Sequence, residues 1–143
     1  MGLSEAQATS VKGTWKKVAE NLKDHAVKIF VKFLSDNPEQ QAFFKKFEVV
    51  AKEDLAGNED VSKHAMVVMT ALGEYIDVID NADSLKKAVK PVAESHKPRK
   101  ITLPNFQKMF PVIVDYVVTN VDGDKEAWTT ALETIGTAIS TQQ

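Results

Sequence analysis

Apolar side chains recur along this chain at the three- and four-residue spacing of amphipathic helices. The first stripe follows a capping-box pattern formed by Ser4 and Gln7, and its apolar positions are Val11, Trp15, Val18 and Leu22. Further stripes lie within residues 26–34, 61–79, 85–96, 103–117 and 128–139. The sequence shows neither strand-like alternation with paired turns nor an internal repeat. The pattern therefore predicts an all-α fold of six to eight helices in a single domain, residues 1–143.

Prolines and polar residues indicate where these helices begin and end. Pro38 disfavours helix at the residue before it and can itself begin a short helix. Residues 48–58 are less periodic, so we expect a loop there with about one helical turn. Asn58 stands where a helix N-cap is expected, and residues 80–84 predict a polar connection. Pro111 lies inside an otherwise helical segment and predicts a kink or an early irregularity in it.

The composition excludes several classes of protein. The 143 residues include 18 basic and 20 acidic side chains, and a net charge of −2 excludes a strongly basic nucleic-acid binder and an acidic disordered tail. Cysteine is absent, which excludes disulfides, thiolate zinc sites and cysteine nucleophiles. The sequence contains no run of about 18 apolar residues, the length that a membrane-spanning helix needs. The polar N-terminal segment is not typical of a signal peptide. We therefore expect a cytoplasmic protein with no nucleic-acid or membrane partner.

Two of the three histidines could carry chemistry. His64 and His96 fall on the apolar faces of predicted helices, whereas His25 lies near a helix start and is expected to be exposed. A buried imidazole needs a hydrogen-bond partner or a metal. If the helices over 61–79 and 85–96 pack as a hairpin, about 22 Å of helix leads away from His64 and about 18 Å leads back to His96. The two imidazoles would then face each other across a gap.

This gap admits two interpretations. A flat apolar cofactor could fill it, with one histidine bound to its iron and the other hydrogen-bonded to the molecule on the free side of the metal. A core-facing histidine is, however, more often a hydrogen-bonded structural residue, and the aromatic cluster within residues 30–47 is more often plain core. The spacing alone leaves both interpretations open, and under the second the chain is a helical interaction module without haem.

Several motifs resemble those of the globin family, and together they cover essentially the whole chain. Pro38, with Phe44 six residues on and Phe47 three further, resembles the start of the third globin helix and its invariant phenylalanine. The segment 59–73 looks like the distal helix of myoglobins, and the segment 91–96 looks like the proximal helix. Residues similar to those of molluscan intracellular haemoglobins and myoglobins are 2–4, 99–101 and 127–129.

The resemblance implies a globin fold around a pocket for haem b (iron protoporphyrin IX). It implies that His96 is the proximal iron ligand and that His64 donates a hydrogen bond to bound O₂, which carries partial negative charge. CO and NO are further ligands that the family binds. The residues implied to line the pocket, the first two of them next to O₂, are Phe30, Val68, Phe44, Phe47, Val92, Ile101, Phe106 and Met109. The candidate cations for the two haem propionates are Arg99, Lys46 and Lys100.

Two departures from vertebrate myoglobins bear on these expectations. Vertebrate proteins usually have leucine where Phe30 falls, so we expect a tighter and drier distal side here. The 32-residue separation of His64 and His96 is three residues longer than in vertebrate myoglobins and matches molluscan ones. The corner after His96 is one residue shorter than in vertebrates, which leaves open which cation meets which propionate.

The resemblance implies reversible O₂ binding by an oxygen storage or transport protein of the myoglobin or haemoglobin kind, and not an enzyme. Two alternatives share the fold. One is an enzyme, such as a nitric oxide dioxygenase, nitrite reductase or peroxidase, and the other is a six-coordinate redox sensor in which His64 itself binds the iron. The expected state is a monomer or weak homodimer, because charges on the outer helix faces favour a small wet interface over a large dry one. These charges belong to Lys63, Glu74, Lys87 and Lys90.

Overall fold

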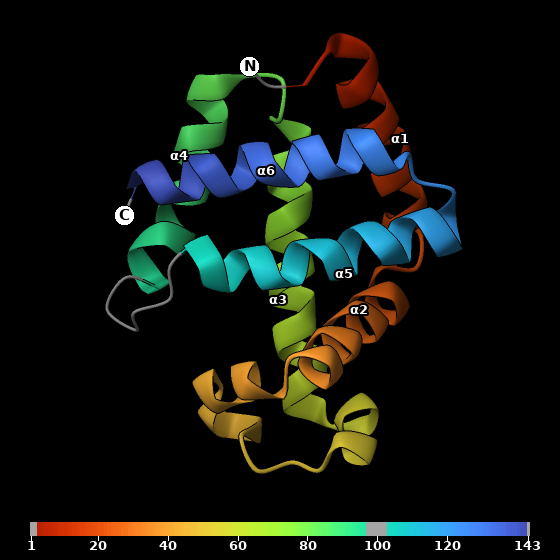
Figure 1. Cartoon of the computed structure of the whole chain (residues 1–143), viewed down its shortest axis with the longest axis vertical. Coiled ribbons are helices and arrows are strands. Elements are labelled where there is room, and N and C mark those ends of the chain that lie inside the picture. The colour runs from red at the N-terminus through yellow and green to blue at the C-terminus, as the bar shows by residue number, and fades with distance from the viewer. Residues whose placement is uncertain (1–2, 97–102, 143) are drawn as a thin grey trace.

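The computed structural model describes residues 3–96 and 103–142, apart from the side chains of residues 95–96, 103–106 and 142 (Figure 1). The described part contains helices and no strand, as the periodicity predicted. Its α-helices are α1 (Glu5–Ala19), α2 (Leu22–Asp36), α3 (Glu59–Asp77), α4 (Ala82–His96), α5 (Leu103–Val121) and α6 (Lys125–Gln142). Its short 3₁₀ helices are η1 (Pro38–Phe43), η2 (Lys45–Phe47) and η3 (Lys52–Gly57).

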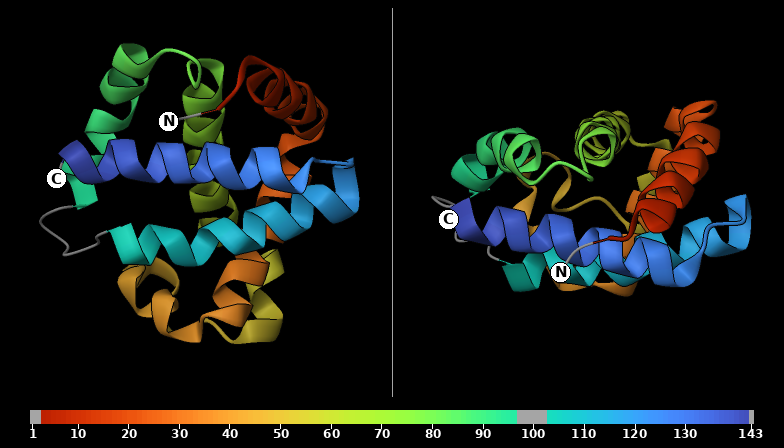
Figure 2. Two further views of the ribbon diagram at one scale, coloured as in Figure 1. Left: turned by 45° about the horizontal axis from the view of Figure 1, so that its top comes forward. Right: turned by 90° about the horizontal axis from the view of Figure 1, so that it is seen from above.

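The helices cross one another in two layers. Figure 1 shows α5 and α6 side by side in front, with α3 running behind both at a steep angle. Seen from above, α3 and α4 form the layer behind α5 and α6 (Figure 2). The helix α6 packs against α1, α4 and α5, while α2 packs against α3 and α5. The three 3₁₀ helices lie together at the bottom of Figure 1, beside the ends of α2 and α3.

Local hydrogen bonds explain where two of the helices begin. At α1, the Ser4 Oγ accepts a bond of 3.0 Å from the Gln7 amide, and the Gln7 Oε1 accepts one of 3.0 Å from the Ser4 amide. At α3, the Asn58 Oδ1 accepts a bond of 3.0 Å from the Val61 amide. Such side-chain acceptors satisfy amides that a helix start leaves without partners. The capping box and the Asn58 cap are confirmed.

Two expectations about helix boundaries need correction. Leu22 begins α2 and does not extend the stripe of α1. The helix α4 begins at Ala82, inside the segment expected to be a polar connection, because the Asn81 Oδ1 accepts a bond of 2.9 Å from the Ser84 amide. The helix α5 continues through Pro111 as one element.

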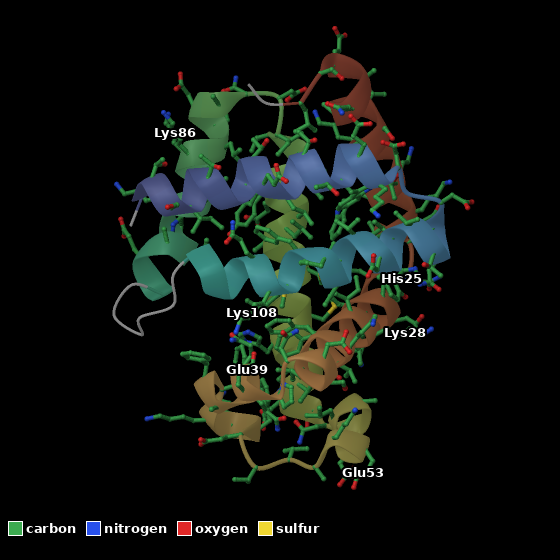
Figure 3. All side chains as sticks on the ribbon, in the orientation of Figure 1. His25, Lys28, Glu39, Glu53, Lys86 and Lys108 are labelled. Carbon is green, nitrogen blue, oxygen red and sulfur yellow. The ribbon has the colours of Figure 1, made fainter. Side chains whose placement is uncertain are left out.

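His25 is half-buried, which contradicts the expectation of an exposed side chain. Its Nδ1 lies 2.7 Å from the hydroxyl oxygen of Tyr116, and the two rings meet edge to face. Burial raises the pKa of the Tyr116 hydroxyl above its usual value. The contact joins α2 to α5 on the side of the molecule where Figure 3 labels His25. His25 is therefore a structural residue in this fold.

A pair of tryptophans forms the core where α1, α3 and α6 meet. Trp15 and Trp128 are buried, with ring centroids 6.4 Å apart. Gly73 of α3 allows this approach, because a Cβ on it would lie 2.7 Å from the Trp15 Nε1. The absence of a side chain at Gly73 thus lets α1 pack directly against α3.

Within the described residues, no helix is long and apolar enough to cross a lipid bilayer.

Candidate functional site

An apolar cavity of about 180 Å³ lies between α2, α3, α4, α5, α6 and the 3₁₀ helix η1. Its polar lining groups are few, and none of the described lining residues carries a fixed charge. The lining residues are Phe30, Phe33, Gln40, Phe43, Phe44, His64, Val67, Val68, Ala71, Leu72, Tyr75, Val92, Met109, Phe110, Ile113, Ile135 and Ile139. A cavity with such walls favours an apolar ligand over water, because water needs several polar partners.

Helix α3 supplies much of one wall of the cavity, including His64. His64, Val68, Ala71 and Tyr75 are spaced by three or four residues, so they lie on one face of the helix. The same periodicity on α2 places Phe30 and Phe33 against this face. A histidine therefore stands in a wall that is otherwise apolar along most of its length.

Three phenyl rings surround the imidazole of His64. Their ring centroids lie 4.7 Å from it for Phe44, 5.2 Å for Phe30 and 6.2 Å for Phe47. Phe44 and Phe47 stack at 5.1 Å with an interplanar angle of 13°, and Phe30 meets both of them edge to face. Packing of this kind limits the rotamers of an imidazole. It also keeps the donor N–H of the ring in surroundings of low polarity, where hydrogen bonds are electrostatically strong.

Tyr75 is the other titratable group in the cavity wall. Its side chain is buried, and burial raises the pKa of its hydroxyl to about 12, with a smaller contribution from the nearby charge of Glu74. The phenol is therefore neutral at physiological pH.

Most of the sequence-predicted pocket residues that the structure describes come together here. Those that line the cavity are Phe30, Phe44, His64, Val68, Val92 and Met109. Phe47 is buried behind Phe44 and does not itself line the cavity. Lys46 is exposed and also stands outside the lining. Arg99, Lys100 and Ile101 lie outside the described residues, as do the side chains of His96 and Phe106.

Sequence reasoning did not identify several lining residues. Ala71 and Tyr75 could have been found, because they continue the His64 face of α3. Ile135 and Ile139 belong to α6, and only the tertiary packing brings that helix to the cavity. Two further lining residues are exposed apolar side chains, Phe43 at 40% and Val67 at 65% of their surface, which indicates that the cavity opens beside them.

The residues present fit a flat, largely apolar cofactor. An unfilled cavity of this size would lower stability by about 4 kcal/mol, at about 24 cal/mol for each Å³. A bound apolar group removes that cost, and the aromatic walls offer stacking surfaces to a planar one. The imidazole of His64 adds a polar group that could meet a metal centre or its ligand.

Comparison with known proteins identifies relatives along the whole chain. The family model described as Globin matches residues 27–139. A protein named Globin from the mollusc Nerita albicilla is 29% identical over 146 aligned positions, which cover 99% of this chain and 93% of the relative. A protein named Globin from the mollusc Aequiyoldia eightsii is 28% identical over 148 positions, which cover 100% of both chains.

Proposed function

Because this chain belongs to the globin family, we propose that it holds haem b in the apolar cavity and binds O₂ reversibly there. The observation that carries the proposal is the position of His64, in the cavity wall and between the rings of Phe30 and Phe44. Haem, when bound, supplies the iron atom at which a diatomic gas coordinates. CO and NO are proposed as further ligands.

His64 acts in this proposal as a fixed hydrogen-bond donor. A neutral imidazole carries one N–H donor, and the phenyl rings around His64 restrict where this donor can point. O₂ gains partial negative charge when it binds ferrous iron, so a donor already in place stabilises it more than a donor that must first reorient. The same donor favours neutral CO much less. His64 thus slows the escape of O₂ and discriminates between the two gases.

Phe30 and Val68 keep water away from the bound gas. Phe30 is 1% exposed and lies in contact distance of His64, and Val68 stands one turn further along the same face of α3. Water and protons promote oxidation of ferrous iron, and an apolar shell limits their access. Phe44 offers its ring to a planar group, and Met109 and Val92 close the cavity on other sides.

His96 is proposed as the proximal iron ligand on the strength of the resemblance of segment 91–96 to the proximal helix of globins. It is the C-terminal residue of α4. Lys46, Arg99 and Lys100 are proposed as the cations that meet the propionates. Phe106 and Ile101 are proposed to complete the pocket, as the family resemblance implies.

The wider proposal is oxygen storage or transport in the cytoplasm by a monomer or weak homodimer, without enzymatic turnover as the main role. The apolar cavity favours the gas-binding role, since a protein that stores or carries O₂ needs a dry pocket for the gas and a hydrogen-bond donor beside it. Enzymatic reactions such as nitric oxide dioxygenation would need an electron supply to restore the ferrous state.

The visible spectrum of the reduced protein under argon and then in air tests the proposal. A broad five-coordinate band under argon that becomes a stable oxygenated spectrum in air is the expected result. No haem band after haem is offered would refute the function, and a sharp low-spin spectrum under argon would place His64 on the iron and favour a redox or sensing role.

A pair of variants tests the role of His64. His64→Leu removes the donor, and O₂ should dissociate about 10 to 100 times faster, because hydrogen bonds to charged groups contribute about 1.5–3 kcal/mol. His25→Leu is the matched control, since His25 contacts Tyr116 and does not line the cavity. Equal dissociation rates in parent and His64→Leu, measured by stopped-flow displacement of O₂ with CO, would contradict this role.

A further inference from the structure

We propose that Gln41 is a positioning residue that fixes the backbone between η1 and η3 and thereby holds His64 in place. The inference rests on the proposed function, because it concerns how the same cavity retains its gas. Gln41 lies at the fourth position of η1 and is half-buried. Neither the cavity lining nor the motifs of the sequence include it.

The side-chain amide of Gln41 bonds to three backbone carbonyls of one corner. Its Nε2 lies 2.7 Å from the Phe47 oxygen, 2.9 Å from the Val50 oxygen and 3.3 Å from the Glu48 oxygen. An amide nitrogen has two hydrogens, so the two shorter contacts are its principal bonds and the third is shared. A single side chain thus ties together the four residues 47–50, which we call the corner.

The corner has few other anchors. Phe47 is buried, whereas Val49 is 94% exposed, the largest exposure among the exposed large apolar side chains of the described residues. The backbone bonds within the corner are long, at 3.2 Å from the Phe47 amide to the Phe44 oxygen and 3.2 Å from the Val50 amide to the Phe47 oxygen. Segments with little buried apolar area and few hydrogen bonds open at low free energy. Loss of the Gln41 amide should therefore loosen this segment first.

The helix that carries Gln41 is itself held on the body of the protein. Lys108 of α5 forms an ion pair of 3.2 Å with Glu39 of η1, and Figure 3 shows the two labelled side chains facing each other between these elements. A backbone hydrogen bond at Glu39, followed by the side-chain bond with Lys108, lowers the pKa of the Glu39 carboxyl. Pro38 begins η1 with a fixed backbone angle. Gln41 consequently connects a fixed helix to a weakly fixed corner.

Movement of the corner would change the packing around His64, through the rings of Phe47 and Phe44. Phe47 supplies one of the carbonyls that Gln41 binds, and its ring stacks on Phe44. Both rings contact the imidazole of His64. If the stacked pair shifts, the imidazole gains rotational freedom, and the population in which its donor faces the cavity falls. The rate at which a gas leaves the cavity would then rise, because the gas dissociates faster from molecules in which the donor faces away.

The test compares Gln41→Met, Gln41→Lys and Gln7→Met in the haem-loaded protein. Methionine keeps the length of the side chain and removes the donor, whereas lysine retains N–H donors at a similar reach. Gln7→Met is the matched control, because the Gln7 side chain also makes a hydrogen bond to the backbone. That bond belongs to the capping box of α1 and not to the corner. Two readouts are needed: hydrogen exchange of the Phe47 and Val50 amides, and the dissociation rate of O₂.

Gln41→Met should raise both rates about tenfold, the factor expected when one or two hydrogen bonds of ordinary strength are lost. Gln41→Lys should restore both to within about twofold of the parent, and Gln7→Met should change neither by more than about twofold. Unchanged amide exchange in Gln41→Met would overturn the inference. Faster exchange with an unchanged O₂ dissociation rate would also overturn it. Failure of the parent protein to take up haem would instead overturn the proposed function, and with it the link to gas escape.

Discussion

Replacement of Ala71 by leucine should have opposite effects on the cofactor-free and the haem-bound protein. Ala71 lies on the cavity face of α3, between His64 and Tyr75 along the helix. Leucine forms helix nearly as well as alanine, so the backbone should tolerate the change. The three added carbon atoms would enter space that is open in the cofactor-free protein and that the cofactor needs.

The structure sets the size of the effect. Burial of three methylene-sized groups contributes about 0.8 kcal/mol each, and ordering the leucine side chain costs about 0.5–1 kcal/mol. The net gain for the cofactor-free protein is about 1.5–2 kcal/mol. It lies below the ceiling of about 4 kcal/mol that the 180 Å³ cavity allows. For a chain of this length the gain corresponds to a rise in Tm of about 5 °C.

Two assays follow the two effects of Ala71→Leu. Thermal unfolding of the cofactor-free protein, followed by circular dichroism, should show the higher Tm, and titration with haem should show weaker uptake than in the parent. Ala6→Leu is the matched control, because Ala6 is exposed on α1 and its replacement should change the free energy of unfolding by less than about 0.5 kcal/mol. A lower Tm for Ala71→Leu would show that the cavity has no room for the added carbons. Unchanged haem uptake would show that the cofactor does not occupy this cavity.

Two further predictions concern packing and pH. Gly73→Ala should destabilise the protein, because its Cβ would lie 2.7 Å from the Trp15 Nε1, whereas Gly13→Ala, with no atom within 4 Å, should stabilise α1 by about 0.5–1 kcal/mol in urea unfolding. The pKa of Tyr75 is raised to about 12, so the folded protein keeps a proton that the unfolded chain releases above pH 10. Between pH 10 and 12 the parent should therefore lose stability with rising pH more steeply than Tyr75→Phe, by up to about 1.4 kcal/mol per pH unit. Equal slopes for the two proteins would contradict the buried phenol.

Local signals in the sequence were enough to predict much of the helical framework. Ser4 and Asn58 each cap a helix through an amide three residues ahead, so the relevant partner was visible in the sequence. The beginning of α4 was not predicted, because Asn81 and its polar neighbours have the composition of a loop. Only the structure shows that the Asn81 side chain accepts a hydrogen bond from the Ser84 amide and so caps the helix. A polar cluster at a helix N-terminus and a polar loop have nearly the same composition.

Partners distant in sequence explain what could not be predicted. The surroundings of His25 depend on Tyr116, 91 residues further along the chain. Periodicity shows that a residue faces the interior, but not which helix it will meet, and so Ile135 could be assigned to the core and not to the cavity. The closeness of His64 to Phe30 and Phe44 followed from family resemblance and not from spacing. Phe30 belongs to α2, His64 to α3, and Phe44 lies between η1 and η2, so only packing brings the three rings together.

The pairing of Trp15 with Trp128 also determines how this protein can be observed. These are the only two tryptophans of the chain, and both indoles lie in the same core contact, 6.4 Å apart. The tryptophan fluorescence of the protein therefore arises from one place, where α1 and α6 meet. A haem group absorbs at the wavelengths at which indoles emit, so its arrival should quench this emission through energy transfer. An increase in emission would then report loss of the cofactor or separation of the helices, while motion of the corner near Val49 would leave the emission unchanged.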